Sequence, residues 1–323
     1  MTSPLIRAAT PADLTALVDL QNAASPDQPT TLELQEFRER NRKPQLAFGR
    51  LVAELGGQVR GVASFAQQEW SGETDKLWVY VTVHPEARGQ GIGAALYDAI
   101  RAEMGPHRPS KLGSLVREDR PDALHFAVSR GFTEVAREQE AELEIVQLNI
   151  SQREVAFARA DASGYDLVNF RDYMERVGPD AAWDRLYDFD QDASRDVPLP
   201  PGDTLNMPPL ERYRQNYEDN PKFDPSLWFV AVQGDTVAAV SQLWASGLPG
   251  VMDTGFTGVG RAHRGHRLAW ALKYAALEEA ARRGTLRVRT TNDALNAPMR
   301  SINTGLGFLP TPAYLTLSLT LKS

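Results

Sequence analysis

Two short glycine-containing loops hold the residues best suited to chemistry. The first is Arg88-Gly89-Gln90-Gly91-Ile92-Gly93, between a run of β-branched residues and an alanine-rich run with helical spacing. A strand that leads through a glycine loop into a helix binds anions, because the first helical N–H groups lack partners within the helix. Glycine lets the backbone approach a phosphate, and arginine adds charge-assisted hydrogen bonds. Residues 88–93 therefore predict a pyrophosphate site.

The spacing of this loop excludes two common phosphate motifs. A Walker A loop ends in Gly-Lys-Ser/Thr, and no such ending is present. The dinucleotide motif needs Gly-x-Gly-x-x-Gly inside a βαβ unit, whereas residues 89–93 read Gly-Gln-Gly-Ile-Gly and follow a hairpin-rich region.

The second loop is Arg264-Gly265-His266-Arg267-Leu268-Ala269. Arg267 stands where the first loop has Gly91. A side chain at this position could crowd a phosphate, or it could turn outward and add a contact, since guanidinium suits phosphate. The sequence leaves both alternatives open.

Both loops belong to a repeated pattern. Arg88 and Arg264 are 264 − 88 = 176 residues apart, Gly131 and Gly307 are 307 − 131 = 176 apart, and the turns at 56–57 and 234–235 are 234 − 56 = 178 apart. A fixed offset across several elements indicates two copies of one domain. We predict an N-terminal domain at 1–150 and a C-terminal domain at 151–323, whose extended arm covers about residues 165–227.

The expected elements follow the same order in both copies. The first copy predicts a helix at 12–24, a hairpin turning at 56–57, strands at 76–83 and 112–116, and helices at 94–104 and from 121 to about Gly131. The second copy predicts a hairpin turning at 234–235, strands at 251–259 and 285–292, a helix capped by Gly284 and a helix ending at Gly305 or Gly307. The arm predicts one short helix, at 210–218, in an otherwise irregular segment.

The loops and their setting resemble the GCN5-related N-acetyltransferase (GNAT) family. Residues 88–93 match in full that family's acetyl-CoA loop, Arg/Gln-x-x-Gly-x-Gly/Ala. The preceding "VTVHPEA" resembles the family's strand end, and Gly-Phe at 131–132 and 307–308 resembles the end of its late helix. The second copy is similar to a tandem subgroup, so the resemblance covers nearly the whole chain.

This resemblance implies an α/β fold with a mixed, mostly antiparallel sheet and helices on both faces. The fourth and fifth strands of each copy would splay apart, and the pantetheine arm of acetyl-CoA would lie between them. In the first copy the cofactor residues implied are Val81, Val83, Arg88, Gly89, Gln90, Gly91, Ile92 and Gly93. In the second they are Thr257, Val259, Arg264, Gly265, His266, Arg267, Leu268, Ala269 and Asn296.

The catalytic groups are less clear than the loops. Many family members carry a tyrosine four residues before the late glycine as the proton donor, but these positions hold Ala127 and Asn303. Tyr80 and Tyr97 are weaker alternatives, and each is more typical of packing. Asp253 is the candidate general base, since it lies on the strand before the second loop.

Other polar residues near the loops have ordinary explanations. His84 and Glu86 flank the first loop, and Glu69, Glu73 and Asp75 precede its strand, as solvated groups at a strand end would. The arm's aromatic residues could shape an acceptor pocket or fill the second core: Tyr173, Trp183, Tyr187, Phe189, Tyr213 and Tyr217.

The composition restricts the possible partners. The chain has 323 residues, a formal net charge of −7 and no cysteine, which argues against nucleic-acid or membrane partners and excludes disulfides and thiolate metal sites. The five histidines lack metal-ligand spacing, so we expect no metal. The start does not resemble a signal peptide and no run could span a membrane, so we expect a cytoplasmic protein.

We therefore expect an acetyl-CoA-dependent N-acetyltransferase that acts on the amine of a small molecule by direct transfer. The alternative is a non-catalytic acyl-CoA-binding sensor or scaffold, which the missing tyrosines and Arg267 favour. The two hypotheses differ in one observation, since only the enzyme releases CoA in an amine-dependent manner.

Overall fold

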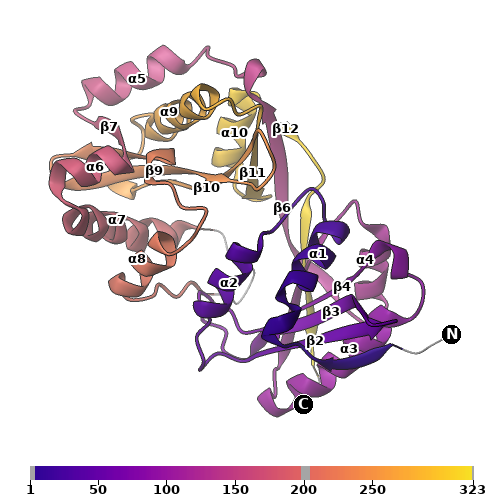
Figure 1. Cartoon of the computed structure of the whole chain (residues 1–323). Helices are drawn as coiled ribbons and strands as arrows, with labels where there is room; N and C mark the ends of the chain where they lie inside the picture. Colours follow the sequence, from indigo (N-terminus) through magenta and orange to yellow (C-terminus); the bar gives the residue numbers. More distant parts are fainter. Residues whose placement is uncertain (1–3, 198–203, 322–323) are drawn as a thin grey trace. The chain divides into compact units, whose positions relative to one another are not determined.

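The computed structural model describes residues 4–197 and 204–321, and these form two compact units (Figure 1). The first unit comprises Met1–Arg137, Pro200–Asn206 and Tyr314–Ser323, and the second comprises Glu138–Leu199 and Met207–Ala313. The units therefore change over at 137/138 rather than at the predicted 150/151, and the C-terminal strand lies in the first unit. Among the described residues, no helix has the length and apolarity needed to cross a bilayer.

The sheet of the first unit has the strand order β1-β2-β3-β4-β5-β13, followed by the first residues of β6. Its strands are β1 (Leu5–Ala8), β2 (Phe48–Leu55), β3 (Gln58–Ala66), β4 (Lys76–Val83), β5 (Lys111–Arg117), β13 (Tyr314–Thr320) and β6 (Thr133–Glu144). Only the β4–β5 pair is parallel among the pairs described in this unit. The sheet is thus mixed and mostly antiparallel, as predicted.

Helices cover both faces of this sheet because its strands alternate apolar side chains to both sides. Leu77 and Val79 of β4 share a core with α3 (Ile92–Met104) and with Ala127 of α4 (Pro121–Val128). Trp78, between them in the chain, points to the opposite face. On that face α1 (Leu14–Ala24) packs against β3 and β4, and α2 (Leu32–Arg40) packs against α1.

The sheet of the second unit repeats this order. Residues 138–144 of β6 pair with β11, and the order continues β11-β10-β9-β8-β7, with β12 beside β6. The strands are β7 (Asp166–Asn169), β8 (Trp228–Gln233), β9 (Thr236–Ala245), β10 (Val251–Val259), β11 (Arg287–Asp293) and β12 (Leu309–Pro310). Its one described parallel pair is β10–β11, the counterpart of β4–β5.

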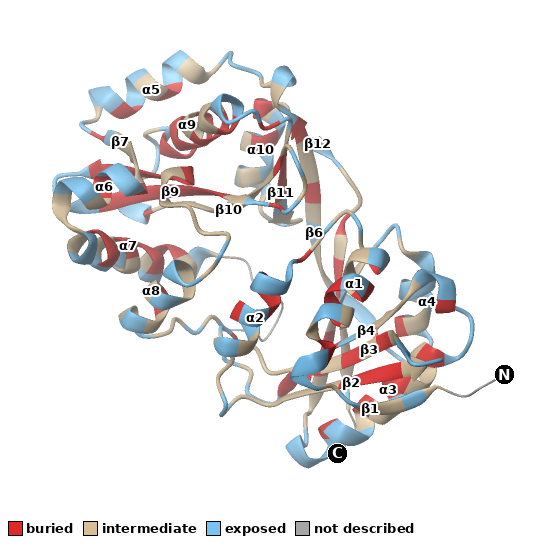
Figure 2. Cartoon of the chain, in the orientation of Figure 1, coloured by how far each residue is buried: buried red, intermediate tan, exposed pale blue. Residues whose placement is uncertain are grey.

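Two groups of helices enclose the second sheet. One group comprises α5 (Arg153–Ala162), α9 (Leu268–Arg282) and α10 (Ala297–Leu306); the other comprises α6 (Phe170–Val177), α7 (Pro179–Ala193) and α8 (Leu210–Glu218). Figure 2 shows buried residues concentrated in β9 and α9, whereas α5 is largely exposed. Most of the arm's aromatic residues lie in this core, which confirms packing as their main role: Tyr173, Trp183, Phe189 and Tyr213 are buried.

The predicted elements match closely. Strands 76–83 and 251–259, both hairpin turns and the short helix at 210–218 have the predicted bounds. The sequence did not predict α6 and α7, because the arm was expected to contain only one short helix. It also missed the glutamate-rich β6 and the exchange of β13, whose partner β5 lies about two hundred residues earlier in the chain.

Candidate cofactor loops and active site

The first loop is an open backbone cradle. β4 leads through a short turn, Pro85–Ala87, into the loop and then into α3. Gly89 and Gly91 have positive φ angles of 75° and 79°, and Gly91 is the N-cap of α3. A Cβ built on either glycine meets no atom within 4 Å. The conformation therefore favours glycine, and no atom of the described chain crowds either glycine.

Arg88 stands at the rim of this cradle. Its Nε donates to the carbonyl oxygen of Val83 at 3.3 Å, and its side chain is exposed. Among the described residues no carboxylate pairs with it. The guanidinium thus keeps donors for an anion at the loop, as the loop prediction requires.

The strands beside the loop splay as predicted. β4 and β5 are paired only as far as Trp78 and Gly113. The N–H of His84 donates to the carbonyl of Arg60 at 2.9 Å, so by antiparallel alternation the backbone groups of Val81 and Val83 point away from β3. They face the open side of β4, where an extended chain could add hydrogen bonds like a further strand.

The second loop keeps the same backbone without glycine at its last turn. Arg267 is the N-cap of α9 and has a left-handed φ of 59°, while Gly265 has a φ of 84°. The Arg267 side chain points away from the helix start, since its Nη1 donates to Oε1 of Gln152 at 2.9 Å. Of the two alternatives, the structure therefore has the outward one. Leu268 and Ala269 begin α9 and are buried.

The arginine of the second loop is paired with an acid. Arg264 repeats the position of Arg88, since its Nε donates to the carbonyl of Val259 at 3.4 Å. Its Nη2 also contacts the carboxylate of Asp196, which in addition accepts from Nε of Arg261 at 3.0 and 2.9 Å. These two guanidinium groups hold the pKa of Asp196 well below its usual range.

The histidines of the second loop pack locally. His266 shares a hydrogen bond of 2.9 Å with Oγ of Ser163, and His263 shares one of 2.9 Å with the hydroxyl of Tyr165. Both imidazoles also lie against the Tyr165 ring. Of the described residues, no group of three metal-ligating side chains is placed to hold a metal ion.

The second unit differs from the first at the strand before the loop. β10 pairs with β9 at Thr254↔Leu243 and again at Thr257↔Ser241, so β10 contains one extra residue, a β-bulge. In the first unit, β3 and β4 pair without a shift. Beyond the bulge Thr257 and Val259 face away from β9, because the N–H of Gly260 donates to Ala238 at 2.9 Å.

Specific side chains hold the bulge. The backbone N–H of Phe256 donates to Oε1 of Gln242 at 3.1 Å. A Cβ on Gly255 would lie 2.4 Å from Nε1 of Trp244, so only glycine fits without displacement. Phe256 packs against Phe189 of α7 with ring centroids 6.5 Å apart. The arm helices therefore cover the face of the sheet that carries the bulge.

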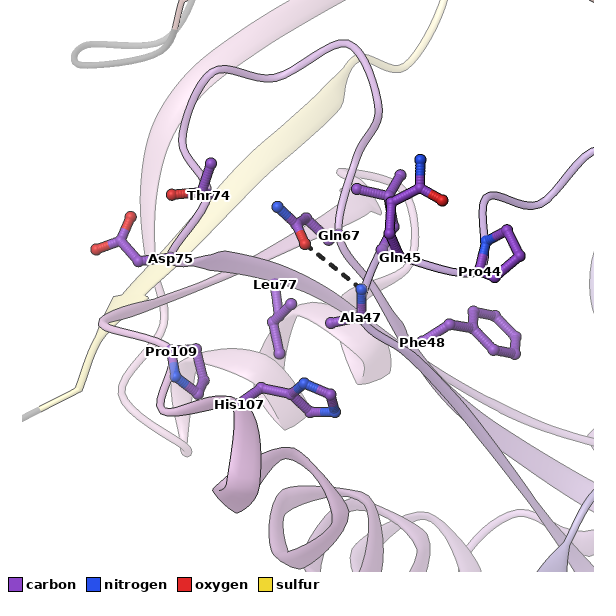
Figure 3. A pocket seen from close by; sticks show the side chains of 11 residues that line it. Pro44, Gln45, Ala47, Phe48, Gln67, Thr74, Asp75, Leu77, His107 and Pro109 are labelled. Carbon is purple, nitrogen blue, oxygen red and sulfur yellow. Dashed lines mark hydrogen bonds between the residues drawn. The ribbon is translucent and has the colours of Figure 1, made fainter.

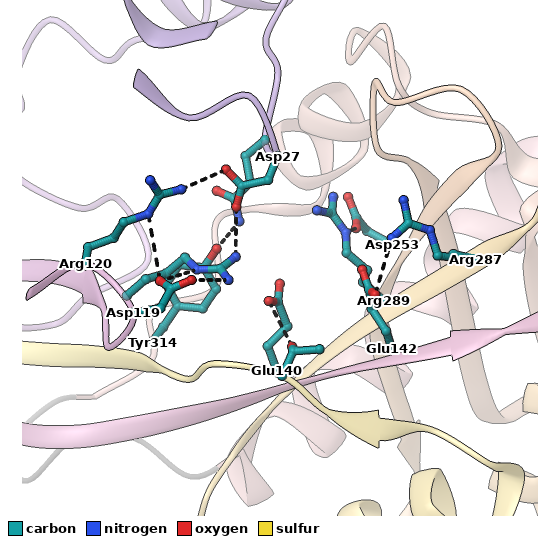
Figure 4. Close-up of polar contacts among 12 residues, drawn as sticks. Asp27, Asp119, Arg120, Glu140, Glu142, Asp253, Arg287, Arg289 and Tyr314 are labelled. Carbon is teal, nitrogen blue, oxygen red and sulfur yellow. Dashed lines mark hydrogen bonds and ion pairs between the residues drawn. The ribbon is translucent and has the colours of Figure 1, made fainter. Parts of the chain in front are cut away.

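Asp253, the candidate base, lies in an ion pair. Its Oδ1 accepts from Nε of Arg289 at 2.8 Å, directly across the last paired residues of β10 and β11. Figure 4 shows this pair beside a second one between Glu142 and Arg287. Asp253 is 38% exposed and Arg289 is 9% exposed, so the acid is the more accessible member of the pair.

Glu138 is a carboxylate that the sequence analysis missed. It pairs across the sheet with Asp293, the last residue of β11. Glu138 is exposed at the surface, but desolvation by the protein around it, and then the charge of Asp293, raises the pKa of Glu138. By strand alternation Glu138 shares the sheet face of Arg289 and Asp253. Only the pairing of β6 with β11 brings Glu138 and Asp293 together, because the two acids are far apart in the chain.

The arm contains a second unusual carboxylate, Asp190 of α7. Its Oδ2 accepts from the hydroxyl of Tyr213, while its Oδ1 is buried with no hydrogen-bond partner in the described part of the chain. Burial raises the pKa of Asp190 to about 7. Burial also raises the pKa of Tyr213 and Tyr217, and the charge of Asp190 adds to both shifts.

The residues at the family's tyrosine position donate no phenol. Ala127 is buried in α4, and Asn303 of α10 donates from Nδ2 to Oδ1 of Asn292. Tyr80 stacks near Trp78 with centroids 6.4 Å apart, and partial burial raises the pKa of Tyr80 to about 12. Tyr97 packs edge-on against Phe126. Asn296 acts as the N-cap of α10, with Oδ1 accepting from the Met299 N–H at 3.3 Å.

A separate cavity of about 340 Å³ lies in the first unit near the starts of β4 and β5 (Figure 3). It is lined by Pro44, Gln45, Leu46, Ala47, Phe48, Gln67, Thr74, Asp75, Leu77, His107 and Pro109. None of the predicted cofactor residues lines it. The cavity is at the other end of β4 from the glycine loop, so it does not belong to the predicted cofactor site.

Comparison with known proteins gives a family match within the first unit. Residues 14–132 match the model of the Acetyltransferase (GNAT) family. This part of the chain is thus similar to a GNAT domain. The match covers α1 to the start of the strand after α4 and includes the first glycine loop. A GNAT fold supports acyl transfer from acetyl-CoA in general. No curated protein matches the chain in sequence.

Solved structures extend the likeness to both units. A tandem GNAT protein from the clavulanic acid biosynthesis pathway is 22% identical with a TM-score of 0.73, covering 99% of this chain and 98% of its own. A GCN5-related N-acetyltransferase from Sphaerobacter thermophilus is 20% identical, with a TM-score of 0.68 and coverage of 99% and 96%. A putative acetyltransferase from Pyrococcus horikoshii is 15% identical, with a TM-score of 0.56 and coverage of 100% and 91%. The chain thus has the tandem GNAT fold.

Proposed function

We propose that the protein is an N-acetyltransferase that transfers the acetyl group of acetyl-CoA to the amine of a small molecule, and that the second unit performs the transfer. The observation that carries this assignment is the β-bulge of β10, which β4 lacks. A bulge leaves the ladder locally disrupted and re-aims the backbone groups of the strand. Such groups can stabilise the oxyanion that forms when an amine attacks a thioester.

The proposed cofactor contacts use the backbone N–H groups and arginines at each loop. The first N–H groups of α3 and α9 would receive the pyrophosphate, with Arg88 and Arg264 beside them. Val81 and Val83 in one unit, and Thr257 and Val259 in the other, would pair with the pantetheine arm through their outward backbone groups. When bound, acetyl-CoA supplies an acetyl thioester as the electrophile.

Two carboxylates are proposed as the proton acceptor for the amine. Asp253 is partly exposed, and its Oδ1 already accepts from Nε of Arg289. Glu138 is exposed at the surface, but desolvation by the surrounding protein and then the charge of Asp293 raise its pKa, so its carboxylate is a better proton acceptor than an ordinary glutamate. β10 and β11 run parallel and pair as far as Asp253 and Arg289. Beyond that point β10 carries the bulge, and β11 carries Asp293 paired with Glu138 of β6.

The first unit supports a different role. The position that Asp253 and Arg289 hold across the parallel strands is occupied by Trp78 and Gly113, whose Cβ would lie 3.0 Å from the indole. This packed pair has no acid–base group. We propose that the first unit binds acyl-CoA without catalysing transfer, which is the sensor hypothesis applied to one unit.

The experiment is a CoA-release assay with a panel of amines, using the wild type, Gly255→Val and Tyr80→Phe. Distorting the bulge should lower turnover by about 100-fold or more, the usual effect of losing an oxyanion donor. Tyr80→Phe, at the matching place of β4, should stay within about twofold of the wild type because it removes no proposed group.

Gly255→Val could also fail to fold, so Gln242→Leu serves as a second variant. It removes the acceptor of the Phe256 N–H but leaves the backbone path intact, and the melting temperature reports folding. Loss of turnover in the folded Gln242→Leu supports the assignment. Amine-dependent release that survives both changes, or that is abolished by Tyr80→Phe, contradicts it.

A further inference from the structure

The second loop already holds an anion, the carboxylate of Asp196. This residue ends the short turn Ser194–Asp196 that follows α7. Its two oxygens accept from Nε and Nη2 of Arg261 and from Nη2 of Arg264. Both arginines lie in the segment between β10 and α9. The carboxylate is therefore bound by the donors next to the N-terminus of α9.

The first loop has neither of the added groups. Position 85, which corresponds to Arg261 by the offset of 176, is a proline. Arg88, like Arg264, donates from Nε to a carbonyl at the end of the preceding strand. In the described part of the chain, however, Arg88 has no acidic partner. The second unit has thus gained one guanidinium and one carboxylate at the same place.

Carboxylate and phosphate compete for the same guanidinium donors. Arginine binds both through paired N–H groups, and a phosphate offers more acceptor oxygens and more charge. Asp196 occupies two donors of Arg261 and one of Arg264. A phosphate that binds there must first displace it, after which both arginines are available.

We propose that Asp196 is an internal competitor for the cofactor's phosphate at the second loop, and that Arg261 is a further phosphate-binding residue of that loop. The inference rests on the proposed function, because it assumes that the second loop receives acetyl-CoA. The ligand at this site would be a phosphate ester of a coenzyme. Because Asp196 competes with it, the second loop should bind that phosphate less tightly than its two arginines alone would allow.

The test is calorimetric titration of the full chain with CoA. Arg88→Glu is present in every variant sample to weaken the first loop, so that the second is measured, and the wild type is titrated beside them. Asp196→Asn removes the charge at constant shape and should tighten binding by about tenfold, the scale of one charge-assisted hydrogen bond. When Arg261→Gln is added to Asp196→Asn, CoA binding should weaken again by a similar factor.

Asp188→Asn is the matched control. Asp188 is an exposed carboxylate of α7, the helix just before the turn that holds Asp196, so the change in net charge is the same. It should leave CoA affinity unaltered. If Asp188→Asn tightens binding as much as Asp196→Asn, the effect is one of overall charge and the inference is overturned.

Other outcomes separate this inference from the proposed function. Unchanged or weaker CoA binding in Asp196→Asn, in an enzyme that still turns over, overturns the inference alone. Absence of both CoA binding and amine-dependent CoA release in the wild type and every variant overturns the proposed function. Tightening by Asp196→Asn that is lost on adding Arg261→Gln supports both residue assignments.

Discussion

The two units begin their α3 and α9 helices from loops of the same form, but the strands that lead into those loops differ. β4 is regular and carries Trp78 packed on Gly113, whereas β10 is bulged and carries Asp253 paired with Arg289. The difference teaches that a retained cofactor loop does not by itself indicate a retained reaction site. In this chain the strand, more than the loop, distinguishes the units.

The two loops share a backbone conformation but differ in their side chains. Gly91 and Arg267 both take a left-handed conformation at the helix start, although only glycine adopts it without cost. The contact from Arg267 to Gln152 helps to offset that cost. The backbone path into the helix is thus common to both units, while the side chains around it have diverged.

Buried carboxylates give the largest expected contrast. In the first unit Asp13 is buried but bound by both terminal nitrogens of Arg7, which holds the pKa of Asp13 well below its usual range. In the second unit Asp190 is buried, with no cation paired to it in the described part of the chain, and its pKa rises to about 7. The two groups should therefore give the units opposite pH dependences.

For Asp190 the free energy of unfolding should fall as the pH rises from about 4 to about 7, because the native state holds a proton that the unfolded chain has released. A shift from 3.8 to about 7 corresponds to a loss on the order of 4 kcal/mol. Asp190→Asn should abolish this loss and be the more stable protein at pH 8. Chemical unfolding followed by tryptophan fluorescence at pH 5 and pH 8 measures it.

Asp13 provides the internal control for this prediction. Its contribution to stability is present at neutral pH and is lost only as the pH falls below the usual range of an aspartate. Asp13→Asn should therefore destabilise the chain at pH 8. Equal responses of the two variants between pH 5 and pH 8 would contradict the contrast.

The second largest contrast is between the two proposed general bases, Glu138 and Asp253. Glu138→Gln should lower kcat by about 100-fold or more, the usual effect of losing a general base, and flatten the acidic limb of the pH–rate profile. Asp253→Asn should cost less, because Oδ1 of that carboxylate is already occupied by Nε of Arg289. Steady-state rates of CoA release from pH 5 to 9 give the comparison. A larger loss in Asp253→Asn would make Asp253 the base and Glu138 a structural acid.

The loop arginines should differ by a smaller factor. Arg88→Gln should weaken CoA binding at the first loop by about tenfold, because its guanidinium has no carboxylate partner to leave among the described residues. Arg264→Gln should weaken the second loop less, since Arg264 must first give up Asp196. Titration calorimetry of both variants tests the order, and the reverse order would show that Asp196 does not compete.

The smallest expected effect concerns Arg267. Replacement by glycine removes a left-handed non-glycine residue but also the bond to Gln152, so the unfolding free energy should change by less than about 1 kcal/mol. The reciprocal Gly91→Arg has no such compensation and should destabilise the first unit by about 1–2 kcal/mol. Thermal unfolding of the two single variants checks this asymmetry.

Sequence reasoning succeeded where the signal is local. The turns at 56–57 and 234–235, the helix at 210–218 and both glycine loops follow from neighbouring residues, and all were predicted. It failed where the signal is a pairing. The extra residue at Gly255–Phe256 is a bulge only in register with β9, and Glu138 meets Asp293 only through β6 and β11. Asp196 reaches Arg264 from 68 positions away, so no motif around the loop could reveal it.

The exchange of β13 has a consequence for synthesis. The edge of β5 receives its partner only when residues 314–320 have been made, which is 314 − 117 = 197 residues after the end of β5. At 5–20 residues per second this is about 10–40 s during which a ribosome-bound chain carries an unfinished first sheet. An unpaired strand edge invites pairing with other chains. The glycine loop that is translated first therefore belongs to a domain that is completed last.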